Sequence, residues 1–161
     1  MTVRRTAALF ALAGLALRAV AANGATTSPC KLVTVADVKA AFGGTVSAGK
    51  LDTSLPEAPT CHFAVKGSNL GLSGTAVVFV TPGQTPQTFA IAKKIVPGAV
   101  TVAGVGTAAF YNPHTTSIEL LKGTVVANAQ AIFLNPGGPQ PDAARTKADT
   151  IVLARAVAKH V

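Results

Sequence analysis

The sequence predicts an α+β fold with a mainly antiparallel sheet of about five to seven strands. Three helices accompany the sheet, at about residues 34–42, 86–96 and 142–159. Strand patterns come in runs, and helix patterns stand outside these runs instead of alternating with single strands, which is typical of α+β proteins. Residues 124–134 also alternate with the period of a half-buried strand. One face of this strand carries Val125, Ala127, Ala129, Ala131 and Phe133, and the other carries Thr124, Asn128 and Gln130.

The chain begins with the pattern of an export signal. The pair Arg4-Arg5 precedes the apolar run Ala7–Leu17, which is too short to span a bilayer. Ala19-Val20-Ala21 then provides a small-residue cleavage site. We expect residues 1–21 to be a helical signal peptide that is cleaved after Ala21. The alternative is a buried N-terminal helix.

The rest of the chain is long enough for one domain. We expect residues 22–29 to form a linker and residues 30–161 to form a single α+β domain. No stretch after the leader is long and apolar enough to predict a transmembrane span. The predicted location is therefore secreted or extracytoplasmic.

The charge distribution argues against a nucleic-acid partner. The formal net charge is +8, and removal of Arg4, Arg5 and Arg18 leaves +5. The bases are scattered apart from Lys93-Lys94 and the C-terminal helix, and the chain has seven Phe, one Tyr and no Trp. A nucleic-acid binder is expected to concentrate its bases in a patch. A soluble basic surface is favoured, and attraction to anionic envelope polymers or lipid headgroups is the alternative.

Two cysteines, Cys30 and Cys61, remain in the predicted mature chain. An even count in an exported chain favours a disulfide between them. Closing a loop of 31 residues is worth about 3.5–4 kcal/mol by chain entropy. Free thiols and lipidation of Cys30 are the alternatives, but Thr27-Ser28-Pro29 before Cys30 is not a lipidation sequence.

The first predicted helix begins after Thr34, a good N-cap residue, with Asp37 in its first turn. Gly43 provides the stop. The expected apolar face consists of Val35, Val38, Ala41 and Phe42.

Strand patterns follow this helix. Thr45–Ala48 is a brief strand candidate, and Gly49–Pro59 is expected to be a polar loop. In Thr60–Lys66, Cys61, Phe63 and Val65 face one way, whereas Thr75–Thr81 is continuously apolar, as in the middle of a sheet.

The second predicted helix has Thr85 at its N-cap and Pro86 at its first position, and Pro97-Gly98 ends it. Phe89, Ala92 and Ile95 or Val96 form its expected apolar face. Four strands are expected after it: Ala99–Ala103, Thr107–Asn112, Ser117–Leu121 and Thr124–Leu134.

The last predicted helix, Asp142–Lys159, follows a linker rich in proline and glycine, Asn135–Pro141. Its expected buried stripe consists of Ala144, Ala148, Ile151, Ala154 and Ala158. Because this stripe and the alanine face of residues 124–134 both carry small side chains, we expect a close contact between the helix and the sheet.

The sequence contains no convincing catalytic or metal-binding pattern. Cys61 and His62 would point to opposite faces of a strand, which argues against a nucleophile–base pair. His62, His114 and His160 lack the spacing of zinc ligands. The glycine-rich stretch Gly67–Gly74 has no lysine and precedes no helix, so it is not a phosphate loop. We predict no catalytic residue, metal or cofactor, and a non-enzymatic role is favoured.

Three short motifs resemble those of small exported actinobacterial domains. They are Cys30 before Val-Ala-Asp-Val-x-x-Ala-Phe-Gly (residues 35–43), Cys61 before Phe63, and Val-Gly-x-Ala-Ala-Phe-Tyr (residues 105–111). Many of these domains are lipoproteins of unknown function. The resemblance covers Cys30–Leu134 and implies an envelope-exposed α+β domain with one disulfide, without catalytic residues. This chain lacks their lipid-attachment cysteine, which puts membrane anchoring in doubt.

The favoured function is an exported, extracytoplasmic binding or interaction module. Its partner would be an unknown envelope protein or a small apolar ligand, in the latter case as an envelope-associated carrier. Phe110, Tyr111 and His114 are the candidate ligand-binding residues, near the Gly104–Gly106 joint and the Asn112–Thr115 turn. The alternative is a small secreted hydrolase, which requires His62 or His114 beside an acid and a hydroxyl group.

Overall fold

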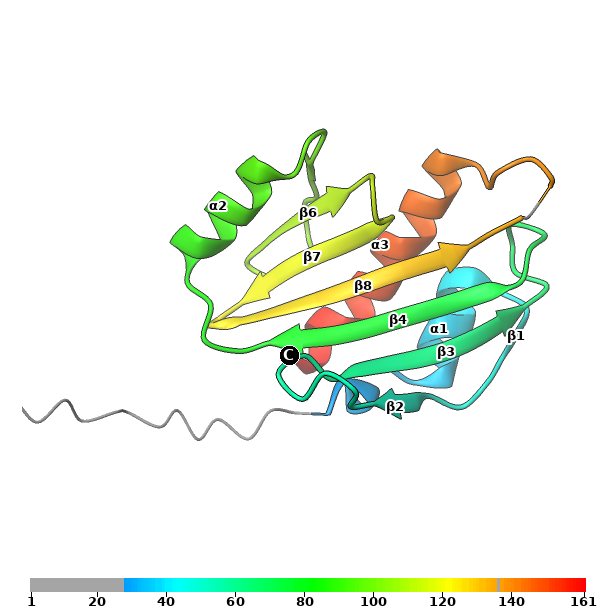
Figure 1. The fold of residues 1–161 in the computed structure, drawn as a ribbon, viewed down its shortest axis with the longest axis horizontal. Coiled ribbons are helices and arrows are strands. Elements are labelled where there is room, and N and C mark those ends of the chain that lie inside the picture. Colours follow the sequence, from blue (N-terminus) through cyan, green and yellow to red (C-terminus); the bar gives the residue numbers. More distant parts are fainter. Residues whose placement is uncertain (1–27, 136) are drawn as a thin grey trace, which may run out of the picture.

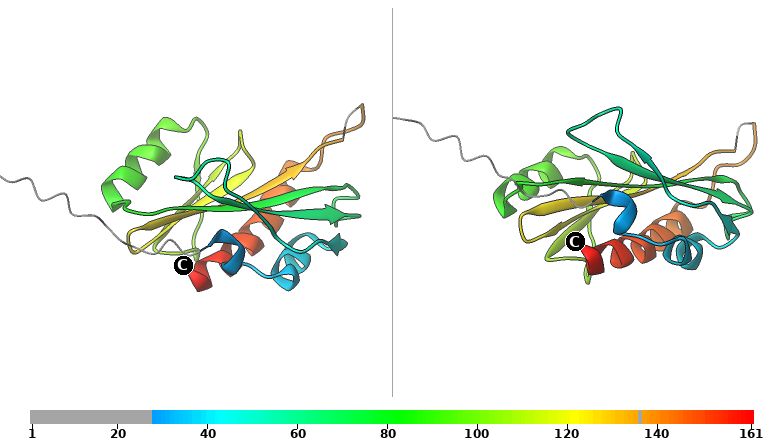
Figure 2. Two further views of the ribbon diagram at one scale, coloured as in Figure 1. Left: turned by 60° about the horizontal axis from the view of Figure 1, so that its bottom comes forward. Right: turned by 90° about the horizontal axis from the view of Figure 1, so that it is seen from below.

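The structure, a computed structural model, describes residues 28–135 and 137–161. The predicted signal peptide and most of the predicted linker lie outside these residues. The fold is α+β, with one eight-stranded sheet in which every strand pairing is antiparallel. Helices α1 (Val35–Phe42) and α3 (Ala143–His160) lie on one face of the sheet, and α2 (Pro86–Ile95) lies at one end of the opposite face (Figures 1 and 2).

The strand order is β1-β3-β4-β8-β7-β6-β5, and β2 also pairs with β3 at the edge. A short 3-10 helix, η1 (Pro29–Lys31), precedes α1. The strands are β1 Thr45–Val46, β2 Lys50–Asp52, β3 Thr60–Lys66, β4 Gly74–Thr81, β5 Val100–Thr101, β6 Ala108–Asn112, β7 Ser117–Lys122 and β8 Val125–Phe133.

The prediction that Gly49–Pro59 is entirely a polar loop is wrong, because Lys50–Asp52 form strand β2. Lys50, Leu51 and Asp52 pair with residues of β3, but all three side chains are exposed. Without a buried face, such a strand has no alternation that a sequence pattern could reveal.

Helix α1 begins as predicted, with a capping box between Thr34 and Asp37. Val38, Ala41 and Phe42 are buried, whereas Val35, expected on the same face, is 39% exposed. Val35 is the first residue of the helix. The following Gly44 has φ +68°, and a Cβ there would collide with the Lys66 carbonyl oxygen, so the turn into β1 requires glycine.

The main core lies between the sheet and the helices α1 and α3. Ala127, Ala129 and Ala131 of β8 are buried in it, and α3 packs against β7 and β8 as expected. Lys122 Nζ also donates to the Ala158 carbonyl oxygen at 2.8 Å, which joins the end of α3 to β7.

The buried face of α3 differs from the predicted one. Ala144 and Ala148 are exposed. The residues that are buried in their place include Thr146, Thr150, Leu153 and Val157. Both threonine hydroxyls donate to backbone carbonyls four residues earlier, so their burial leaves no donor unpaired.

A second, smaller core holds α2 on the other face of the sheet. Phe89 is the only buried residue of α2, and it packs with Phe110 and Leu121. Ala92 and Val96 are half-buried, whereas Ile95 is 74% exposed. Helix α2 is therefore attached to the sheet mainly through one side chain.

The predicted disulfide between Cys30 and Cys61 is confirmed, and it joins η1 to β3. Cys61 is completely buried. Within the part of the chain that the structure describes, no helix is both long and apolar enough to cross a membrane.

Candidate ligand-binding site

The candidate residues Phe110 and Tyr111 lie on opposite faces of β6, as neighbours in a strand must. Phe110 is fully buried against Phe89, with ring centroids 5.3 Å apart. Tyr111 belongs to the main core, where Lys147 Nζ lies 5.3 Å from its ring centroid, and burial raises the pKa of its hydroxyl. The two side chains are therefore packed in different cores, on opposite faces of the sheet, and do not form one site.

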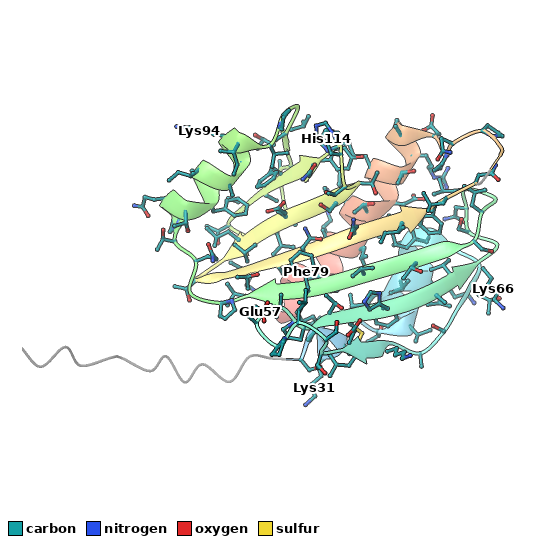
Figure 3. The ribbon with its side chains drawn as sticks, in the orientation of Figure 1. Lys31, Glu57, Lys66, Phe79, Lys94 and His114 are labelled. Atoms are coloured by element: carbon teal, nitrogen blue, oxygen red, sulfur yellow. A yellow bond between two sulfur atoms is a disulfide. The ribbon has the colours of Figure 1, made fainter. Side chains whose placement is uncertain are left out.

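His114 lies in the turn after β6, exposed at the upper edge of the molecule and away from Phe79 (Figure 3). Its backbone N–H donates to Asn112 Oδ1 at 3.0 Å, and its Nε2 lies 3.1 Å from the Pro97 carbonyl oxygen. His114 also lines a hollow of about 420 Å³ between this turn, the end of β8 and the start of α3. It does not approach Phe110 and Tyr111 as part of one site.

The Gly104–Gly106 joint lines another hollow, of about 440 Å³, together with Phe89 and Lys93 of α2. Lys93 Nζ donates to Thr101 Oγ1, which ties α2 to β5. The walls of this hollow are otherwise largely apolar.

A smaller pocket of about 190 Å³ lies on the other side of Phe89, between α2 and the sheet. We call it the α2–sheet pocket. The register places Asn128 of β8 directly opposite both Phe79 of β4 and Glu119 of β7, so these three side chains form a row across the sheet. The pocket is lined by Phe79, Thr81, Gln84, Phe89, Ala92, Glu119, Val126 and Asn128.

Two polar groups distinguish this pocket. Asn128 is only 5% exposed, and its Oδ1 is buried without a hydrogen-bond partner. Leaving such an acceptor unpaired costs about 1–3 kcal/mol. Burial raises the pKa of the neighbouring Glu119 above its ordinary value of 4.5, and a hydrogen bond from the Asn112 side chain lowers it by less. Unpaired polar groups and perturbed carboxyls in a pocket are typical of binding sites.

Another polar contact, outside the α2–sheet pocket, involves His62 of β3. Its Nε2 lies 2.8 Å from Thr60 Oγ1. Asp52 of β2 pairs with Thr60, but its carboxylate accepts from the Ser54 N–H at 2.9 Å, and this hydrogen bond lowers its pKa. No carboxylate among the described residues lies within ion-pair distance of His62. Cys61 is committed to the disulfide and cannot act as a nucleophile for His62.

Metal binding has no geometric support in residues 28–135 and 137–161, where no cluster of three or more His, Cys, Asp or Glu side chains could hold an ion. Comparison of the chain with protein-family models, curated proteins and solved structures found no match.

The sequence patterns did not point to Glu119 and Asn128, the two polar groups that distinguish the α2–sheet pocket. Asn128 had a visible signal, because it is a polar residue in the middle of a long strand, on the face opposite the alanines. The sequence did not show that Glu119 lies beside it, because that depends on the pairing of β7 with β8.

Proposed function

We propose that the protein is an exported binding module that holds a small ligand in the α2–sheet pocket. The observation that carries this proposal is the buried, unpaired Asn128 Oδ1 beside the half-buried Glu119. A ligand that supplies hydrogen-bond donors would recover the free energy that these groups lose on burial.

Export is supported by the leader pattern and by the disulfide, since disulfides persist in oxidising compartments. The resemblance to small exported actinobacterial domains adds the cell envelope as the place of action. In that setting the protein would be a carrier or receptor of the ligand.

The pocket is suited to a ligand about the size of a single ring. An apolar cavity of about 150 Å³ is enough to hold benzene, and the pocket measures about 190 Å³. Because α2 is held mainly by Phe89, it can shift at low cost to admit a ligand.

Benzyl alcohol, a neutral ring with one hydroxyl, is a direct probe of this proposal. In a ¹H–¹⁵N NMR titration, we expect shifts of the backbone amides around Phe79, Phe89 and Asn128. Ala92→Trp fills the pocket from α2 and should abolish these shifts. Ile91→Trp, on the exposed side of the same helix, should preserve them. Shifts that persist in Ala92→Trp would contradict the proposal, and so would the absence of pocket shifts with benzyl alcohol and with the charged probes described below.

The hydrolase alternative rests on the Thr60–His62 contact, which joins a hydroxyl to a possible base. Threonine and histidine two residues apart on one strand face also pair for structural reasons alone. Hydrolysis of para-nitrophenyl acetate decides between the two roles. Activity that Thr60→Val and His62→Asn both abolish would support the hydrolase, and activity equal to the background rate would reject it.

A further inference from the structure

We infer that the ligand of the α2–sheet pocket is a primary ammonium compound with an apolar body the size of one ring. This inference rests on the proposed function and adds the chemical class of the ligand. It follows from three properties of the pocket: its charge, its hydrogen-bonding groups and its aromatic walls.

Glu119 is the only charged residue that lines the pocket. In the described part of the chain it forms no ion pair, and burial raises the pKa of its carboxyl. Lys93 of α2 lines the other hollow, where it donates to Thr101. A desolvated carboxylate without a counter-ion is costly, and a cationic ligand would supply the missing charge.

The hydrogen-bonding groups favour the same class. Asn128 Oδ1 and the Glu119 carboxylate are acceptors on directly opposite residues of β8 and β7. An ammonium group has three donors and no acceptor, so it can serve both residues at once. A ligand carboxylate or phosphate would instead place its negative charge against Glu119.

The rest of the wall suits the body of such a ligand. Phe79 and Phe89 line the pocket from the sheet and from α2, and Val126 adds apolar surface. A cation near an aromatic face gains a further attraction. The small volume excludes long acyl chains, so the body is a ring or a short branched group.

Benzylamine, benzyl alcohol and benzoate are matched probes, since they share one ring and differ in the charge of the attached group. In NMR titrations at neutral pH, we expect benzylamine to bind about tenfold or more tightly than benzyl alcohol, as a charge-assisted hydrogen bond predicts. Benzoate should cause no shifts at the pocket. Glu119→Gln should reduce benzylamine binding to the level of benzyl alcohol, and Glu57→Gln, in an exposed loop, should have no effect.

The outcomes separate this inference from the proposed function. Equal binding of benzylamine and benzyl alcohol at the pocket, or unchanged benzylamine binding by Glu119→Gln, would overturn the ammonium class and leave the pocket as a binding site. Absence of pocket shifts with every probe would overturn both.

Discussion

Removal of the Cys30–Cys61 disulfide should lower the free energy of unfolding by an amount that follows from the number of residues between the two cysteines. The two cysteines are 31 residues apart in sequence, and the loop-closure model then gives about 3.7 kcal/mol at 25 °C. With the urea dependence usual for small domains, about 1–3 kcal/mol per molar, this loss lowers the unfolding midpoint by roughly 1–4 M. Reduction of the wild-type protein keeps both sulfur atoms in place, so it measures the cross-link alone.

Urea unfolding followed by far-UV circular dichroism, with and without dithiothreitol, is the assay. Cys30→Ala/Cys61→Ala should match the reduced wild type or be less stable, because it also removes the sulfur of the buried Cys61. Dithiothreitol should not affect this variant. A loss below about 1 kcal/mol on reduction would refute the loop-closure reasoning. Two reactive thiols in the denatured, non-reduced wild type would refute the bond itself.

Four further predictions test the fold and the site. Glu119→Gln should raise the free energy of unfolding at pH 7 and have no effect below about pH 4. The reason is that the raised pKa of Glu119 stabilises the fold only at low pH, and this contribution is lost as the pH rises through the pKa of the folded state. Urea unfolding at a series of pH values checks this prediction. Ala129→Leu should cost about 1–3 kcal/mol by overpacking the contact with α3, whereas Ala64→Leu, on an exposed position of β3, should be nearly neutral in the same urea assay. Thr34→Ala should cost about 1 kcal/mol through loss of the capping box of α1, and equal midpoints for variant and wild type would contradict it. Hydrogen exchange should be faster in α2 than in α3, since Phe89 is the one buried residue of α2 whereas α3 buries seven. Equal protection of both helices would contradict this expectation.

The helices and the longer strands could be predicted well from the sequence because local chemistry defines their ends. Thr34 and Asp37 form the predicted cap, and Thr85 with Pro86 begins α2 where expected. Strand β3 has the predicted bounds, because Cys61, Phe63 and Val65 alternate with outward-facing residues. Where a strand has one buried face, its period is visible in the sequence.

The parts that the sequence did not predict depend on long-range packing. Strand β2 has no buried face, and the pairing of β4 with β8 joins segments that are about 50 residues apart. The face of α3 was misplaced because Thr146 and Thr150 can be buried once their hydroxyls bond to the backbone. Phe110 and Tyr111 were both named as candidate ligand-binding residues, and strand geometry places them on opposite faces of the sheet.

Asn128 favours the α2–sheet pocket as the proposed binding site over the other two hollows described above. The other two are larger, at about 440 and 420 Å³, but they lie beside turns and joints whose polar groups find partners, such as Lys93 with Thr101 and His114 with Pro97. The backbone of β8 would pair equally well with valine at position 128, and valine would avoid an unpaired acceptor that costs about 1–3 kcal/mol. For a domain whose total stability is of the order of 5–15 kcal/mol, that cost is large. Under the proposed function, a ligand donor that pairs with Asn128 Oδ1 would offset this cost.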